Sequence, residues 1–188
     1  MELQARKTEL RRRMASLKKA YMEAQLRQLS DKITSRLEES PFFRNASCVA
    51  IYHALPGEVQ TAAFLERWYR QKELLLPLVK GDNLLMVPYK GRDAVAPGAF
   101  GIFEPCNVED AVQLSSGRVD LVVVPGVAFD RNRNRLGRGK GFYDRLLSGL
   151  PVFKAGLCFG FQLVDDVPVS GVEDIPMDAV ITEDEVVI

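Results

Sequence analysis

The sequence predicts an α/β fold in which a largely parallel sheet is flanked by helices, a Rossmann-like three-layer arrangement. Short runs rich in Val, Ile and Leu alternate with segments whose apolar residues recur at helical spacing. That alternation is typical of parallel strands joined by helical crossovers. The chain has 188 residues, and we expect one domain over 1–188 that opens with N-terminal helices within 2–39.

Each element follows from its local pattern. Residues 2–28 have helical periodicity without Gly or Pro, so one long helix is expected, and Ser30 with Asp31 resembles the cap of a second helix. Pro88 favours an edge position for its strand, and Pro77 is expected to break another. Helices are also expected at 62–71 and 139–148, and strands at 48–52, 74–79, 84–89, 119–124, 153–159 and 178–182.

Composition is that of a soluble globular protein, with 47% hydrophobic residues, 27% charged residues and a formal net charge of zero. Nothing in these values indicates nucleic acid or membrane partners, and no apolar run approaches the ~18 residues of a membrane span. Cys48, Cys106 and Cys158 are widely spaced and His53 is the single histidine, so a zinc site is not expected. Reduced, buried cysteines favour a cytoplasmic location.

Charge is unevenly distributed along the chain. Residues 1–30 contain eight Lys or Arg and three Glu, whereas residues 165–188 contain eight Asp or Glu and no Lys or Arg. These segments either surround one polyanion and its metal or are separate solvated faces.

The strongest functional signal lies in residues 125–145. Three alternate glycines follow the apolar run 121–124 and precede an expected helix, and five cations lie among them. Glycine lets backbone N–H groups approach an anion, the cations neutralise it, and a helix N-terminus adds its dipole. The spacing fits neither a Walker A loop nor a dinucleotide-binding fingerprint. We therefore predict a phosphate site of another kind; a plain surface turn is the alternative.

The rest of the site is expected at the carboxyl ends of the strands, where ligands bind in open parallel sheets. The loops concerned are 53–58 and 125–141, together with the acidic stretch near Asp174.

The motif resembles that of the 5-formyltetrahydrofolate cyclo-ligase family. Pro-Gly-Val-Ala-Phe-Asp at 125–130 and Arg-Leu-Gly-Arg-Gly-Lys-Gly-Phe-Tyr-Asp-Arg at 135–145 are similar to the two halves of the family motif. Further similarity lies at Lys7-x-x-Leu-Arg11, at Tyr52 and Glu58, in Gly-Ala-Phe-Gly-Ile-Phe-Glu-Pro at 98–105, and at 174–183. The resemblance covers nearly the whole chain.

The resemblance implies a reaction in which 5-formyltetrahydrofolate and ATP, with Mg²⁺, give 5,10-methenyltetrahydrofolate, ADP and phosphate. The substrate is then a small molecule, and neither nucleic acid nor a membrane is an expected partner. Polyglutamylation of the folate and the oligomeric state are left open. A sugar-phosphate isomerase, a CoA-transferase-like enzyme and a non-catalytic nucleotide-binding regulator are the alternatives; the scarcity of histidine disfavours the isomerase.

The resemblance also implies roles for individual residues. Arg135, Lys140 and Tyr143 would be catalytic, with Arg138 also stabilising charge. ATP contacts would come from Lys7, Arg11, Arg135, Leu136, Gly137, Arg138, Gly139, Lys140, Gly141, Phe142 and Tyr143. Folate contacts would come from His53, Glu58, Phe100, Arg138, Gly139, Lys140, Gly141 and Phe142, and Mg²⁺ ligands from Asp144 and Asp174.

Several of these residues have a structural alternative. Lys7 and Arg11 also fit an exposed helix face, and Asp144 fits a helix cap. His53, Tyr143 and Phe100 also fit packing roles, and Glu58 and Asp174 also fit solvated acids. Three positions depart from the family pattern: Arg133 replaces a usual glycine, Phe142 replaces a tyrosine, and Glu173 stands where a histidine is frequent.

Overall fold

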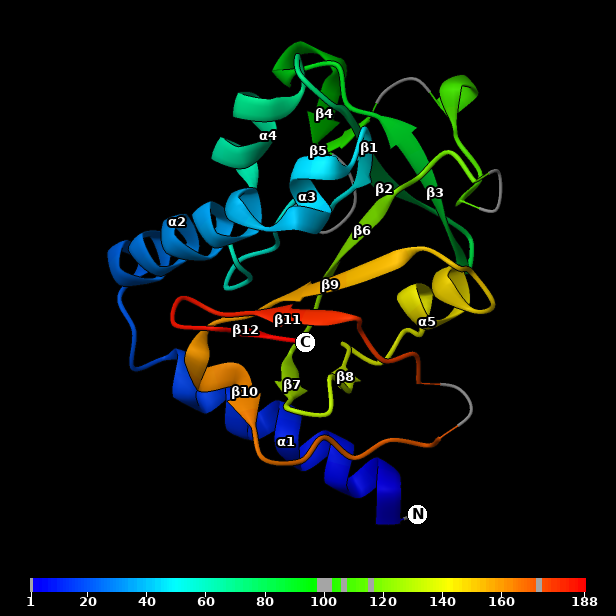
Figure 1. Ribbon diagram of the computed structural model, residues 1–188. Coiled ribbons are helices and arrows are strands. Elements are labelled where there is room, and N and C mark those ends of the chain that lie inside the picture. The colour runs from blue at the N-terminus through cyan, green and yellow to red at the C-terminus, as the bar shows by residue number, and fades with distance from the viewer. Residues whose placement is uncertain (1, 98–102, 106–107, 115–116, 172–173) are drawn as a thin grey trace.

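The computed structural model describes residues 2–97, 103–105, 108–114, 117–171 and 174–188. Its centre is a seven-stranded sheet with five neighbouring parallel strands and one antiparallel strand at each edge (Figure 1). In spatial order the strands are β12 (Val186–Val187), β11 (Ala179–Ile181), β9 (Phe153–Leu157), β6 (Leu121–Pro125), β1 (Cys48–Ala50), β2 (Glu73–Lys80) and β3 (Asn83–Pro88). The predicted α/β class is confirmed.

The strand predictions hold with changes at their ends. The all-apolar β6 is central and the proline-containing β3 is an edge strand, as predicted. The expected break at Pro77 is wrong, because β2 runs through it. Pairing with β1 ends at Leu75, so Pro77 has a strand neighbour on one side only and its missing N–H is tolerated there. The short β12 was not expected; it returns antiparallel to β11.

Helices cover both faces of the sheet, because side chains of successive strand residues point to opposite faces. Val49 and Ile51 of the β1 segment pack in the cluster that contains Ile33 and Phe64, whereas Ala50 packs in the cluster that contains Leu147. The first face is covered by α2 (Glu23–Glu39), α3 (Pro41–Asn45) and α4 (Ala62–Trp68), and the second by α5 (Phe142–Leu147). The last two helices are shorter than the expected 62–71 and 139–148.

The prediction of one helix over 2–28 is wrong. Four residues separate the end of the helix α1 (Glu2–Lys18) from the start of α2. Tyr21, in the connection, stacks on Phe161 with ring centroids 4.6 Å apart, and the side chain of Gln25 accepts a hydrogen bond from Met22 N at 2.8 Å. Ser30 is not a cap, because it lies inside α2 and its hydroxyl donates to Leu26 O at 2.7 Å.

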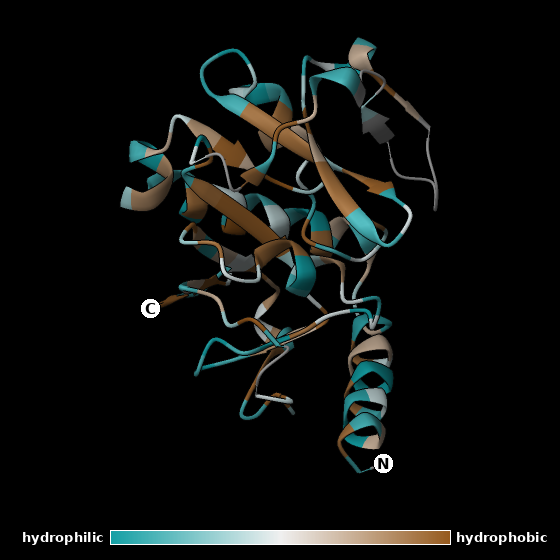
Figure 2. Ribbon diagram, turned by 90° about the vertical axis from the view of Figure 1, so that its right-hand side faces the viewer, coloured by the Kyte–Doolittle hydropathy of each residue, from teal (hydrophilic) through white to brown (hydrophobic). Residues whose placement is uncertain are grey.

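The helix α1 packs on a second, three-stranded sheet below the main one (Figure 1). Residues 125–141 were expected as a loop, but they contain β7 (Ala128–Asp130) and β8 (Arg135–Leu136), which form a hairpin beside β10 (Leu163–Val164). Met14 of α1 is 1% exposed and packs with Ala128, Leu136 and Val167. Figure 2 shows the largely hydrophilic α1 standing apart from the apolar strands of the main sheet.

The remaining described segments are short. The strands β4 (Val95–Pro97) and β5 (Phe103–Pro105) form a separate antiparallel pair, and single helical turns lie at η1 (Arg92–Ala94), η3 (Val108–Asp110) and η5 (Gly160–Gln162). Phe100, Cys106 and Glu173 lie outside the described residues. Within the described part of the chain, every helix is too short or too polar to cross a bilayer.

Candidate active site

The predicted ligand loops meet at the point where the strand order reverses. The chain passes from β1 to β2 on one side, and the later parallel strands are added on the other side of β1, beginning with β6. Loops that leave such neighbouring strands diverge and open a crevice at their carboxyl ends. Glu58 follows β1 and Arg138 follows the β7–β8 hairpin, and Arg138 Nε and Nη2 both lie 3.0 Å from Glu58 Oε1. Residues eighty positions apart therefore form one site.

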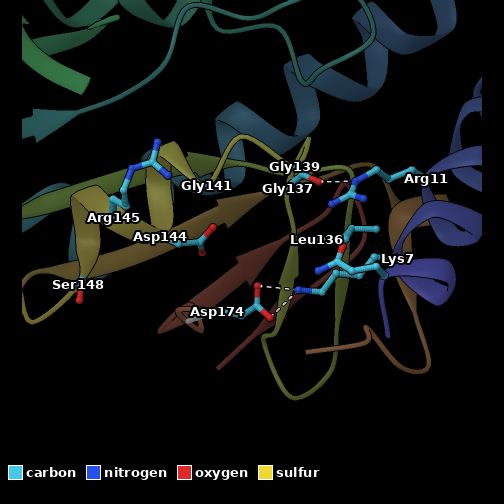
Figure 3. Close-up of a pocket in the computed structure, with 11 residues that line it drawn as sticks. Lys7, Arg11, Leu136, Gly137, Gly139, Gly141, Asp144, Arg145, Ser148 and Asp174 are labelled. Atoms are coloured by element: carbon cyan, nitrogen blue, oxygen red, sulfur yellow. Dashed lines mark hydrogen bonds and ion pairs between the residues drawn. The ribbon is translucent and has the colours of Figure 1, made fainter. Parts of the chain in front are cut away.

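A cavity of about 500 Å³ lies beside this junction, between α1 and α5 (Figure 3). Predicted nucleotide and metal residues from three distant parts of the chain line it. These are Lys7, Arg11, Leu136, Gly137, Gly139, Gly141, Asp144 and Asp174.

Lys7 and Asp174 form an ion pair at one end of the cavity (Figure 3). Lys7 Nζ lies 2.9 Å from Asp174 Oδ1 and 2.7 Å from Oδ2. Lys7 is only 8% exposed, so the interpretation of it as a residue on an exposed helix face is wrong. Burial raises the pKa of Asp174, but hydrogen bonds from Lys7 and Ser170 outweigh it, so the net pKa is lowered and the carboxylate is charged at neutral pH.

Arg135 and Asp144 form a second pair. Arg135 Nη2 lies 2.7 Å from Asp144 Oδ1, and the Arg135 side chain is 4% exposed. Ile175 N donates to the same oxygen at 3.4 Å, which brings the backbone next to Asp174 up to Asp144. The two predicted metal ligands, thirty residues apart in sequence, are thus brought to one cavity. Among the described residues no group of three or more His, Cys, Asp or Glu has the arrangement of a metal site, and two carboxylates suit a cation that keeps water and phosphate ligands.

The glycine loop is held by α1. Arg11 Nε donates to Gly137 O at 2.9 Å. Gly139 and Gly141 have φ of 96° and 66°, a backbone region that side chains rarely tolerate. The helix α5 begins directly after this loop; it has six residues, and Gly141 precedes it without a side-chain cap.

Arg133, at a position where the family usually has glycine, keeps the glycine conformation. Its φ is 65°, the only positive value among the described non-glycine residues. Asp130 supports this turn by accepting hydrogen bonds from Asn134 N and Nδ2, each at 2.9 Å, and from Val167 N at 3.0 Å. Arg133 O accepts from Met177 N at 2.9 Å. The replacement of the usual glycine by Arg133 therefore keeps the same backbone conformation, which hydrogen bonds to the Asp130 side chain stabilise.

Glu58, one of the predicted folate residues, is in direct contact with Arg138, another of them. The Glu58 side chain is 10% exposed, and Oε2 accepts from Leu55 N at 2.9 Å. Burial and, to a smaller extent, the Glu58 carboxylate raise the pKa of Tyr143, which keeps its hydroxyl proton at neutral pH. His53 is half-buried, and burial lowers its pKa, so the ring is neutral there.

Some predicted residues lie outside the cavity wall. Lys140 is exposed, Arg135 lies behind the wall against Asp144, and neither lines the cavity. Phe142 packs under the guanidinium of Arg145, 5.4 Å from its Cζ. Conversely, Gln4, Arg145 and Ser148 line the cavity and were not predicted. Gln4 precedes Lys7 by three residues and Ser148 follows Asp144 by four. Residues at this spacing are neighbours on a helix, so the sequence could have indicated that both face the cavity.

The fold and the site together define an α/β protein with one cavity that gathers Lys and Arg side chains, a glycine loop and two aspartates, beside the Glu58–Arg138 ion pair at the switch point. The sequence profile of the 5-formyltetrahydrofolate cyclo-ligase family matches residues 3–183, and the chain belongs to this family. It is 32% identical over 177 residues to the 5-formyltetrahydrofolate cyclo-ligase of Escherichia coli K12, covering 90% of this chain and 96% of that one. The mouse enzyme of the same name is 26% identical, with 95% and 92% covered.

Two solved structures share the fold. The 5,10-methenyltetrahydrofolate synthetase of Aquifex aeolicus superposes with a TM-score of 0.85 at 37% identity, covering 96% of this chain and 91% of that one. The synthetase of Mycoplasma pneumoniae gives 0.74 at 22% identity, with 94% and 98% covered. The predicted family is confirmed.

Proposed function

We propose that this protein converts 5-formyltetrahydrofolate and ATP into 5,10-methenyltetrahydrofolate, ADP and phosphate. Membership of the cyclo-ligase family supports the reaction. The observation that most supports this site for the reaction is the cavity in which Lys7, Arg11, the glycine loop and two aspartates meet beside Glu58. An isomerase or a CoA transferase uses no ATP and would not need a cavity that gathers cations, a glycine loop and two aspartates. A cytoplasmic location remains a prediction from the cysteine pattern.

The chemistry has two steps. The formyl oxygen attacks the γ-phosphorus of ATP, and the bond from that phosphorus to the bridging oxygen breaks, so that ADP leaves with the electron pair. N10 of the folate then attacks the formyl carbon, the carbon–oxygen bond breaks, phosphate leaves and N10 loses its proton. Both steps move negative charge between oxygens, and preorganised cations and N–H donors stabilise such charge.

Residues in different parts of the site would bind the polyphosphate, the transferred group and the pterin. Arg11 and the backbone of 137–141 would bind the polyphosphate, and Lys140, exposed at the tip of the loop, would close onto the transferred group. Glu58 would accept hydrogen bonds from the N–H edge of the pterin. Tyr143, with its raised pKa, would act as a hydroxyl donor rather than as a base.

Asp144 and Asp174 fit Mg²⁺, which prefers one or two carboxylates together with waters and substrate phosphates. When bound, the ion would offset phosphate charge. Each aspartate now pairs with a cation, Arg135 or Lys7, so these cations are positioned to turn toward phosphate when the carboxylates take a metal.

The activity is tested with purified protein, 5-formyltetrahydrofolate, ATP and Mg²⁺, by following near-ultraviolet absorbance of the methenyl product and release of ADP. We expect both, and neither when ATP is omitted. Binding of ATP without either product would instead indicate a nucleotide-binding regulator and would overturn the proposal.

The metal site is tested by Asp144→Asn and Asp174→Asn. Each should raise the Mg²⁺ concentration that gives half-maximal rate, because one carboxylate ligand is lost. Mg²⁺ titrations that overlay the wild type, with unchanged melting temperatures, would show that the metal is held elsewhere.

A further inference from the structure

Arg145 lies at the end of the cavity opposite Lys7 and Arg11, and no role has been assigned to it so far (Figure 3). It is on α5, one residue after Asp144. Its Nε and Nη2 donate to the carbonyl oxygen of Asp82, in the turn between β2 and β3, at 3.1 and 2.5 Å. The guanidinium also lies over the Phe142 ring, with Cζ 5.4 Å from the centroid. Two contacts thus fix a long, exposed side chain in one place.

These contacts orient the guanidinium without neutralising it. Lys7 and Arg135 pair with Asp174 and Asp144, whereas Arg145, within the described part of the chain, forms no ion pair with a carboxylate. Arg11 is held in the same way, by the carbonyl of Gly137. A backbone carbonyl accepts a hydrogen bond but carries no net charge, so each arginine keeps its full positive charge. The cavity therefore has one uncompensated guanidinium at each end.

Arg145 also keeps donors that Asp82 does not use. A methyl group added at Gly141 would lie 2.7 Å from Arg145 Nη1, so this nitrogen lies against the glycine loop that lines the cavity. A guanidinium has five N–H donors, and two of its nitrogens serve Asp82. The Nη1 donors remain for a ligand in contact with the loop. Ser148, which directly follows α5, lines the same end of the cavity as Arg145 (Figure 3).

We propose that Arg145 binds the polyphosphate chain of the nucleotide at the end opposite Arg11 and so selects a long polyphosphate over a single phosphate. One phosphate reaches one guanidinium, whereas a chain of linked phosphates satisfies both. The ligand is a polyphosphate in chemical class; its identity as the phosphates of ATP rests on the proposed function. The contact with Asp82 positions the side chain before the ligand arrives, which lowers the ordering cost of binding.

The proposal is tested by calorimetry with inorganic tripolyphosphate, and with ATP, on wild type, Arg145→Gln and Arg145→Lys. Loss of a charge-assisted contact in Arg145→Gln should weaken binding of both ligands about tenfold. Arg145→Lys keeps the charge and should lose less. Arg118→Gln is the matched control, because Arg118 is an exposed arginine paired with Glu73 and does not line the cavity.

The proposal is overturned if the wild type fails to bind tripolyphosphate, or if folded Arg145→Gln binds it with unchanged affinity. It is also overturned if Arg145→Gln and Arg145→Lys lose the same affinity, because the effect would then come from the lost hydrogen bonds to Asp82. The proposed function fails separately. If tripolyphosphate binding depends on Arg145 but no methenyl product forms, the contact stands and the reaction is wrong. If product forms and Arg145→Gln binds tripolyphosphate as the wild type does, the reaction stands and the contact is wrong.

Discussion

Lys140 and Arg135 lie five residues apart in the sequence, but their surroundings differ. Lys140 is exposed, whereas Arg135 is buried and paired with Asp144. From the sequence, both were expected to act as loop cations whose removal leaves stability unchanged. For Arg135 that expectation conflicts with its burial, because removing one partner of a buried pair leaves the other charge uncompensated.

Lys140→Ala should lower kcat/KM by roughly 10²-fold, the scale of a lost charge donor, with an unchanged melting temperature. Arg135→Ala should lower activity and also cost about 3 kcal/mol of unfolding free energy. Steady-state kinetics and thermal melts on both variants separate the two roles. Equal melting temperatures for Arg135→Ala and wild type would show that the buried Arg135–Asp144 pair does not stabilise the fold.

The buried thiols give a second prediction at this scale. Cys48 and Cys158 are free and buried, and burial raises the pKa of Cys48 to about 12 and that of Cys158 in the same direction. A thiol with a pKa of about 12 is roughly one part in ten thousand thiolate at pH 8, and thiolate is the reactive form.

We therefore expect neither Cys48 nor Cys158 to react with a thiol reagent at pH 8 while the protein is folded. A Cys106→Ser background removes the third cysteine, and unfolding in denaturant should release both thiols. Fast labelling of either in the native protein would show that the strands around it open readily.

At the scale of elements, one ion pair joins two substrate loops. Glu58, on the loop after β1, is the proposed folate contact, and Arg138, on the loop after β8, is the proposed nucleotide contact; in this structure each is the partner of the other. A nucleotide that takes Arg138 frees one oxygen of Glu58, and a pterin that takes Glu58 frees Arg138. Each substrate should therefore make binding of the second less costly.

We expect a non-hydrolysable ATP analogue to tighten 5-formyltetrahydrofolate binding by about fivefold or more, and the folate to tighten the analogue by the same factor, as linkage requires. In Arg138→Gln this coupling should vanish even where binding persists. Equal folate dissociation constants with and without the analogue, in the wild type, would rule the coupling out.

The sequence predicted those elements whose cause is local. The apolar run of β6 and Pro88 of β3 are sufficient to place these two strands. The break between α1 and α2 is accompanied by Tyr21 stacking against Phe161, a contact across 140 residues. The β7–β8 hairpin is supported by Val167 N donating to Asp130, a contact across 37 residues. The site shows the same division. The motif indicated roles for most of its residues but none for Arg145, its last residue, whose position depends on Asp82 in a distant turn.

At the scale of the whole molecule, the proposed nucleotide cavity depends on the docking of α1, which supplies Lys7 and Arg11. The segment after β10 runs beside α1 (Figure 1), and the two are joined by the Lys7–Asp174 pair and by Arg6 with Asp166 at 2.9 Å. The apolar anchor of α1 is Met14, in the small cluster with Ala128. That cluster is separate from the two that line the main sheet, so α1 can loosen without unfolding the sheet.

Met14→Ala should therefore lower the unfolding free energy by about 2–5 kcal/mol and also raise the KM for ATP, because Lys7 and Arg11 leave the cavity when α1 loosens. Ile33→Ala is the matched control: Ile33 is 0% exposed in α2, so its truncation should cost similar stability without changing the KM for ATP. Leu17→Ala, at a 39% exposed position of α1, should change neither. The two properties are measured by denaturant unfolding and by initial rates at saturating folate. If Met14→Ala and Ile33→Ala shift the KM for ATP alike, the effect reflects lost stability in general, and α1 does not act as the element that carries the nucleotide cations into the site.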